Sequence, residues 1–172
     1  MAGYAAFLRA INVGGRRITG PDLCVPFTEM GFEDVASFRA SGNVVFSAGR
    51  KPSEARIEEG LETALGYDVG VFLRTRAEML ALAAAEPFGA SDLKFHVMFL
   101  KQLPANGARD EVLAHGTDDD RLAFGERELF WEPRGRMVES ELDLKAIGKL
   151  IGTNTMRTKG TVEQIAAKYF GG

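Results

Sequence analysis

The sequence predicts an α+β protein in which two β-α-β-β-α-β halves, each with an antiparallel sheet, pack into one globule. Three observations support this fold class. The chain has 172 residues, 45% of them hydrophobic, which suffices for a sizeable core. The same order of strands and helices recurs on either side of Pro87. The first strands of the two halves also end alike, in Phe7-Leu8-Arg9 and Phe99-Leu100-Lys101.

In the first half, strands are expected where short apolar runs lie between turn residues, at 4–11, 35–40, 44–47 and 69–73. Ser41-Gly42-Asn43 has the composition of a hairpin turn between the second and third strands. Helices are expected where apolar residues recur at helical spacing behind a proline, at 21–30 and 52–65. This element order is the ferredoxin-like pattern.

The second half repeats the pattern behind a connecting helix at 77–86. Its expected strands are 94–100, 121–124, 128–131 and 153–157. Its expected helices are 109–115, a helix that begins at Ser140, and 161–170. The sequence therefore predicts an N-terminal half at 1–75, a helical connector at 76–92, and a C-terminal half with a terminal helix at 93–172.

Composition excludes several classes of protein. The formal net charge is -3 and the isoelectric point about 5.5, which argues against binding nucleic acid or acidic membranes through bulk charge. No apolar stretch approaches the roughly 20 residues of a membrane span, and the N-terminus lacks the features of a signal peptide. We therefore expect a cytoplasmic protein without membrane partners. One cysteine and two histidines exclude an internal disulfide and the usual structural zinc sites.

Positive charge is concentrated in two segments of the chain. Residues 1–20 contain three arginines and no acid, and residues 145–172 contain five basic residues and one acid. If the two segments meet in space, they form a positive patch on an otherwise acidic protein. The alternative is that these side chains are solvated surface, and both interpretations are open.

One end of the first sheet is the candidate binding edge. The first two strands of this fold run in the same direction, so the loop after strand one and the hairpin after strand two lie side by side. Glycines let a ligand approach the backbone, arginines clamp anions, and asparagines add directional amides. The candidate residues are Arg9, Asn12, Gly14, Gly15, Arg16, Arg17, Ser41, Gly42 and Asn43. The alternative is that the glycines and the hairpin merely turn the chain.

Tests for familiar chemistry give negative results. Gly15 and Gly20 have the spacing of a phosphate-binding loop, but Pro21-Asp22 stands where lysine and a hydroxyl residue are required. Cys24 is expected on the apolar side of the first helix as a buried, inert thiol. The run Asp118-Asp119-Asp120 is interpreted as a solvated turn rather than a cation site. The sequence predicts no metal site, no cofactor and no recognisable catalytic motif.

Two N-terminal motifs, FLRAINVGG and GFEDVASFRASGNVVF, resemble the bacterial domain of unknown function 1697 family. The likeness returns at residues 155–162, TMRTKGTV. The resemblance implies two ferredoxin-like halves and no settled activity. Such proteins usually carry Asn-Trp after the Thr-Arg pair, whereas this chain has Thr158-Lys159-Gly160. From this motif Thr155 and Arg157 join the ligand-binding candidates, provided that the last strand returns to the same edge.

Three classes of function are compatible with these patterns. The first is a binding module for a small anionic or phosphorylated ligand or, with weaker support, a nucleic-acid segment. The second is an enzyme of unknown reaction with a site shared between the halves. The third is a structural protein that forms a homodimer through an exposed strand edge.

Overall fold

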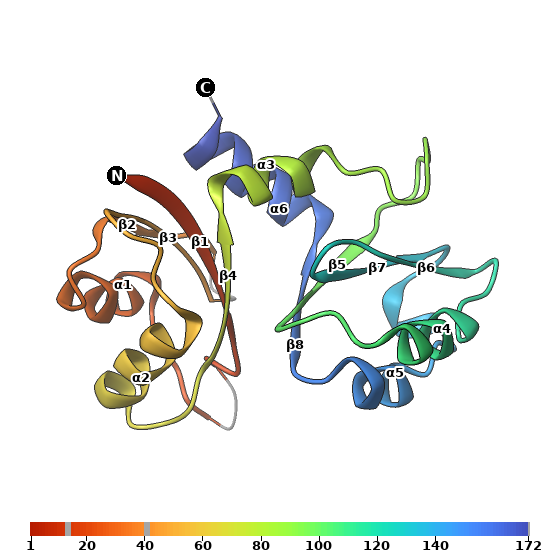
Figure 1. Ribbon diagram of the computed structural model, residues 1–172, viewed down its shortest axis with the longest axis horizontal. Helices are drawn as coiled ribbons and strands as arrows, with labels where there is room; N and C mark the ends of the chain where they lie inside the picture. Colours follow the sequence, from red (N-terminus) through yellow and green to blue (C-terminus); the bar gives the residue numbers. More distant parts are fainter. Residues whose placement is uncertain (13–14, 40–41, 172) are drawn as a thin grey trace. The chain divides into compact units, whose positions relative to one another are not determined.

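A computed structural model describes residues 1–12, 15–39 and 42–171 (Figure 1). The chain divides into two compact units. The N-terminal unit comprises Met1–Leu82 together with Gln164–Gly172, and the C-terminal unit comprises Ala83–Glu163. Each unit contains a separate four-stranded antiparallel sheet, which confirms the predicted α+β fold of two similar halves.

The N-terminal unit has the predicted β-α-β-β-α-β order. Its elements are β1 (Ala2–Arg9), α1 (Gly20–Glu29), β2 (Glu33–Ser37), β3 (Asn43–Ala48), α2 (Glu54–Leu65), β4 (Gly70–Thr75) and α3 (Arg76–Ala84). The strand order in the sheet is β2-β3-β1-β4. Helices α1 and α2 lie on the same face of this sheet (Figure 1).

Local sequence signals explain where these helices begin and end. The Thr19 hydroxyl caps α1 by accepting a hydrogen bond from the Asp22 N–H at 3.2 Å, and Pro21 stands in the first turn. The Ser53 hydroxyl caps α2 through the Arg56 N–H at 3.1 Å. Gly66 ends α2 with φ 82°, a left-handed conformation that favours glycine.

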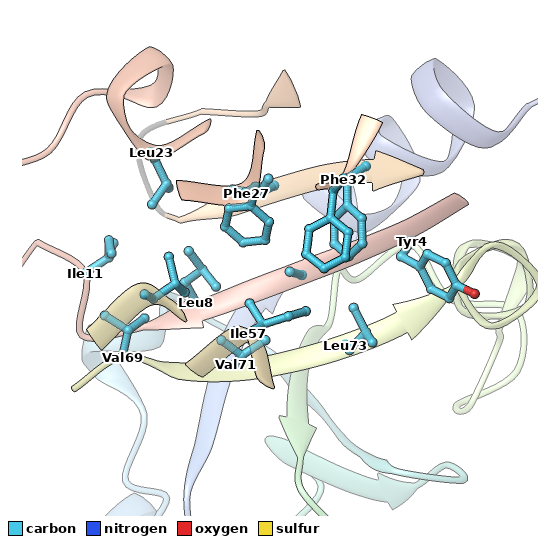
Figure 2. Packing of buried hydrophobic residues seen from close by; sticks show 14 of the residues in the cluster. Tyr4, Leu8, Ile11, Leu23, Phe27, Phe32, Ile57, Val69, Val71 and Leu73 are labelled. Atoms are coloured by element: carbon cyan, nitrogen blue, oxygen red, sulfur yellow. The ribbon is translucent and has the colours of Figure 1, made fainter. Parts of the chain in front are cut away.

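The core of the N-terminal unit lies between the sheet and the two helices (Figure 2). Phe46 of β3 is its centre. Its ring centroid lies 4.4 Å from that of Phe32 and 5.6 Å from those of Tyr4 and Phe27. Ile57 and Leu61 of α2 are fully buried in the same cluster. Burial of this apolar face supplies most of the driving force for folding of the unit.

The C-terminal unit repeats the arrangement. Its elements are β5 (His96–Leu100), α4 (Asn106–Ala114), β6 (Asp120–Phe124), β7 (Glu128–Pro133), a 3₁₀ turn (Met137–Glu139), α5 (Leu144–Ile151) and β8 (Asn154–Thr158), followed by α6 (Lys159–Ile165). Strand order is β6-β7-β5-β8, the counterpart of the first sheet. Helices α4 and α5 pack on one face of the sheet, where Val112 of α4 and Ile147 of α5 join Leu129 and Trp131 of β7 in the core.

The acidic run is not wholly a solvated turn, because its last residue is buried. Asp118 and Asp119 are exposed, but Asp120 begins β6 and is 6% exposed. Its carboxylate accepts hydrogen bonds from the Trp131 Nε1–H at 2.9 Å and the Ser140 hydroxyl at 2.7 Å. A buried carboxylate is tolerated where such donors satisfy it.

The end of the chain belongs to the N-terminal unit, which corrects the predicted boundary at 93–172. After α6 the chain continues as one π-helical turn, Ala166–Phe170. The Arg76 guanidinium donates to the Phe170 carbonyl at 2.9 Å, and the Phe38 and Tyr169 rings meet edge to face at 6.4 Å. A Cβ on Gly3 of β1 would lie 2.9 Å from the Phe170 ring. Sequence periodicity does not contain these long-range contacts.

The expectation of a buried Cys24 is also wrong, since this residue is only half-buried. In α1 the buried residues are Leu23, Pro26 and Phe27. The apolar face of the helix therefore centres on Leu23 and Phe27, and Cys24 lies at its border.

The partial burial of His96 predicts that the stability of the C-terminal unit depends on pH. Its ring lies 5.2 Å from that of Trp131, and burial lowers the pKa of His96 below its ordinary 6.5. The unfolded chain therefore binds a proton near pH 6.5 that the folded chain resists. We expect the stability present above this pH to fall as the pH drops below it.

The measurement is urea unfolding at about pH 7.5 and at about pH 5.5, with Trp131 fluorescence as the signal that monitors unfolding. His96→Gln should lose less stability between the two pH values than the native chain does. An equal loss in both proteins would contradict the assignment to His96.

Candidate functional site

The loop after β1 and the β2–β3 hairpin meet at one end of the N-terminal sheet, as predicted. The Leu8 N–H donates to the Gly42 carbonyl at 2.8 Å, and Phe7 pairs with Asn43 across β1 and β3. Gly42 has φ 82°, and a Cβ there would lie 3.0 Å from Ile11 and 3.2 Å from Leu8. Glycine is thus required for this close approach. We call this end of the sheet, residues 9–12 and 15–17 with 38, 39, 42 and 43, the arginine edge.

Two predicted candidates, Gly14 and Ser41, lie outside the described residues. The two asparagines are used within the fold. The Asn12 side-chain oxygen accepts from the Ile18 N–H at 2.9 Å, and the Asn43 amide donates to the Phe38 carbonyl at 2.8 Å. Asn43 is only 1% exposed. Both residues therefore fix the loop and the hairpin, which makes them positioning residues for the edge.

Arg16 also supports the loop. Its guanidinium carbon lies 3.9 Å from the centroid of the Tyr67 ring, a cation–π contact, and the guanidinium reaches the Ala10 carbonyl at 3.5 Å. The Tyr67 hydroxyl in turn donates to the Ile11 carbonyl at 3.2 Å. These contacts link Ile11 and Arg16 to Tyr67, which follows α2.

Three exposed arginines remain at this end of the sheet: Arg9, Arg17 and Arg39. Arg39 follows β2, lies 5.3 Å from the Phe38 ring centroid and donates to the Gln164 side chain. The backbone is left-handed at Ala10 (φ 64°), Gly15 (φ 79°) and Arg39 (φ 59°). For residues with a Cβ this conformation costs about 1–2 kcal/mol, so packing must hold Ala10 and Arg39 in place.

The candidates Thr155 and Arg157 lie in β8 of the C-terminal unit, and both are buried at 8% exposure. The Arg157 guanidinium donates to the Thr155 hydroxyl at 2.8 Å and to the Met156 carbonyl at 2.9 Å. Burial lowers the pKa of Arg157 from its ordinary value to about 10. Thr155 and Arg157 thus form a second candidate group, which belongs to the C-terminal unit.

The register of the two sheets reveals an equivalent arginine that sequence reasoning missed. Arg157 pairs with Val97 of β5, two residues before Phe99, and Arg74 pairs with Ala5 of β1, two residues before Phe7. Both arginines lie on the sheet face opposite the helix-packed core. Arg74 is 0% exposed, and its guanidinium donates to the Leu73 carbonyl at 2.8 Å.

Hydroxyl caps follow both arginines. The Thr75 hydroxyl accepts from the Glu78 N–H at 3.1 Å, and the Thr158 hydroxyl accepts from the Thr161 N–H at 3.2 Å. The repeated Arg-Thr dipeptide, directly before a helix, is the signal that could have identified Arg74 from the sequence.

The position of Asn43 has a counterpart as well. Glu128 of β7 pairs with Phe99 as Asn43 pairs with Phe7, and Glu128 is 5% exposed. Sequence reasoning missed Glu128, because a single acid at the start of a hairpin strand gives no signal of burial. The C-terminal sheet therefore carries a buried carboxylate, hydroxyl and guanidinium on one face, in Glu128, Thr155 and Arg157.

The available chemistry is that of hydrogen bonding and charge. Within residues 1–12, 15–39 and 42–171, no group of three or more histidine, cysteine or acidic residues could hold a metal ion. In the same residues no helix is long and apolar enough to cross a membrane. Guanidinium groups at the arginine edge suit carboxylate or phosphate oxygens, which they can bind in a bidentate manner.

Comparisons with known proteins agree with the fold and assign no activity. A family model described as protein of unknown function (DUF1697) matches residues 1–130, so the motif at 155–162 lies outside the match. A solved structure, described as conserved bacterial protein SP0830 from Streptococcus pneumoniae, is similar with a TM-score of 0.75 and 26% identity. The similarity covers 96% of this chain and 97% of that chain. No curated protein matches the chain.

Proposed function

Since the chain belongs to the DUF1697 family, whose description names no activity, we propose from its own geometry that it is a cytoplasmic, non-enzymatic binding module for a small anionic ligand. The ligand class is a phosphorylated or carboxylated metabolite. The observation that carries the proposal is that Arg9, Arg17 and Arg39, all exposed, belong to the two segments that meet at the arginine edge.

The internal contacts of the edge support this proposal. Asn12, Arg16 and Asn43 hold the loop and the hairpin through their own hydrogen bonds and ring contact. A fixed frame reduces the conformational entropy that a ligand must remove when it binds. The first twenty residues contain no acid that would repel an anion. An overall charge of -3 favours a small anion over a long nucleic acid.

Homodimer formation through the β4 edge has less support. β4 is the last strand of its sheet, and two carboxylates from α2 cover its outer N–H groups. The Leu73 N–H donates to Glu54 at 2.7 Å, and the Val71 N–H donates to Glu58 at 3.3 Å. Charged side chains on an edge strand oppose pairing with another strand.

Calorimetric titration with inorganic pyrophosphate tests the proposal. We expect Arg17→Ala to weaken pyrophosphate binding about tenfold, because a charge-assisted hydrogen bond contributes about 1.5 kcal/mol or more and about 1.4 kcal/mol corresponds to a factor of ten. Arg50→Ala is the matched control, since Arg50 is also exposed but follows the opposite end of β3. Its affinity should equal that of the native chain.

Equal weakening by both substitutions would indicate nonspecific attraction, and no heat of binding would refute the module. A short single-stranded oligonucleotide is the second probe. Tighter binding of the oligonucleotide than of pyrophosphate, with a steep dependence on salt, would favour the nucleic-acid alternative.

A further inference from the structure

The C-terminal unit contains a cavity of about 630 Å³ that the arginine edge does not include. The cavity is lined by the segment after α4, by the start of β6 and by the chain from the end of β7 to Leu142. Its volume falls in the range of small-molecule sites. Asp120 lies in its wall.

Asp120 is held in one orientation. The Trp131 Nε1–H and the Ser140 hydroxyl both donate to the same carboxylate oxygen, Oδ1, at 2.9 and 2.7 Å. Trp131 is fully buried, and the Ser140 oxygen accepts from the Leu142 N–H at 3.0 Å. The carboxylate is therefore fixed by β7 on one side and by the segment before α5 on the other.

The second oxygen of this carboxylate is available. Among the described residues, none donates a hydrogen bond to Asp120 Oδ2 or forms an ion pair with it. In the described part of the chain, every fully buried side-chain oxygen or nitrogen has a hydrogen-bond partner. Since Oδ2 has none, this oxygen is not fully buried and must face accessible space. Because Asp120 is 94% buried and lines the cavity, that space is the cavity.

The charges around the cavity are net negative. Four acids line it, Asp119, Asp120, Glu139 and Glu141, against two arginines. Both arginines already form ion pairs, Arg134 with Asp119 at 3.3 Å and Arg136 with Glu139 at 2.6 Å. Asp120 and Glu141 are thus the two lining acids whose charges these arginines leave uncompensated, and of the two only Asp120 is buried.

We propose that this cavity binds a small organic cation, a primary amine or a guanidinium group, which donates to Asp120 Oδ2. The buried carboxylate accepts hydrogen bonds from the cationic group of the ligand. Because both lining arginines are already paired with acids, the net charge around the cavity is negative. A fixed acceptor in a partly desolvated wall forms stronger charge-assisted bonds than a solvated one.

The test is a titration of the native chain with n-butylamine and with methylguanidine at constant ionic strength, followed by NMR chemical shifts. We expect shifts confined to residues 115–142 and saturating with concentration. Asp120→Asn should weaken binding at least tenfold. The asparagine Oδ1 can keep both donors, while its NH₂ group replaces the oxygen that faces the ligand.

Asp118→Asn is the matched control. It removes the same charge from the same acidic run, but Asp118 is exposed and does not line the cavity. This variant should bind like the native chain. Butyrate serves as the ligand of opposite charge and should not bind.

Three outcomes would overturn the proposal: no saturable shifts with either cation, equal affinity in Asp120→Asn and the native chain, or equal loss in both variants. If Asp120→Asn fails to fold, Glu141→Gln gives a second readout. Glu141 lines the cavity and forms no ion pair within the described chain. Its substitution should lower the affinity for both cations, by a smaller factor than Asp120→Asn does. Unchanged affinity there would also contradict the proposal.

Discussion

Phe46→Ala should destabilise the N-terminal unit by about 3–5 kcal/mol, the usual cost of truncating a buried phenylalanine. The substitution removes a ring that contacts Tyr4, Phe27 and Phe32. The cavity left behind cannot close, because Phe27 and Ile57 are held by helices on one side and the sheet lies on the other. We expect the urea midpoint measured by far-UV circular dichroism to fall sharply.

Val138→Ala is the control, since Val138 is 82% exposed and its truncation should leave the midpoint unchanged. Because the single tryptophan, Trp131, lies in the C-terminal unit, its fluorescence reports that unit separately. A Phe46→Ala protein with the native midpoint would show that the aromatic cluster does not stabilise the N-terminal core.

Arg157→Met should stabilise the C-terminal unit. Burial lowers the pKa of Arg157 to about 10, so the charged guanidinium disfavours the folded state by about 3 kcal/mol. Stability should accordingly rise as the pH increases above about 10, because the unfolded chain still binds the proton that the folded chain releases. Methionine removes the charge and fills much of the volume. The net gain is smaller than this, because the substitution also removes hydrogen bonds of the guanidinium, those to Thr155 and Met156 among them.

Trp131 fluorescence in urea measures this gain, with Arg157→Lys as the control that retains a buried charge. The lysine variant should be no more stable than the native chain. A lower midpoint for Arg157→Met would show that the guanidinium is structural. A higher midpoint would mean that the native chain retains a destabilising charge at this position. Residues kept for function often destabilise a protein in this way.

The sequence predicted the order of strands and helices because each element carries a local signal. Gly66, Ser53 and Pro21 mark helix ends, and Gly42 marks the hairpin. It also predicted that the loop after β1 lies beside this hairpin, which follows from topology alone. Helical periodicity gave the wrong burial for Cys24. Neighbouring residues of a helix point about 100° apart, so the residue next to buried Leu23 lies at the border of the apolar face.

Roles that depend on distant partners could not be predicted. Arg16 was expected to clamp an anion, yet it stacks on Tyr67, fifty-one positions away along the chain. Asp120 was expected in water, yet Trp131 and Ser140 bury it. Arg74 shares with Arg157 only a following threonine, and the strand register is what shows that the two occupy equivalent positions. Such pairings arise from tertiary packing, which overrides local pattern.

The contact of residues 164–171 with the N-terminal unit has a consequence for synthesis of the chain. Residues 1–82 leave the ribosome first, but the carbonyl of Phe170 that binds Arg76, and the ring that packs at Gly3, emerge only after the whole C-terminal unit. The C-terminal unit is contiguous and can fold as soon as it is made. The N-terminal unit, although first in the sequence, gains its last contacts only when residues 164–171 have been made, so we expect it to be completed after the C-terminal unit.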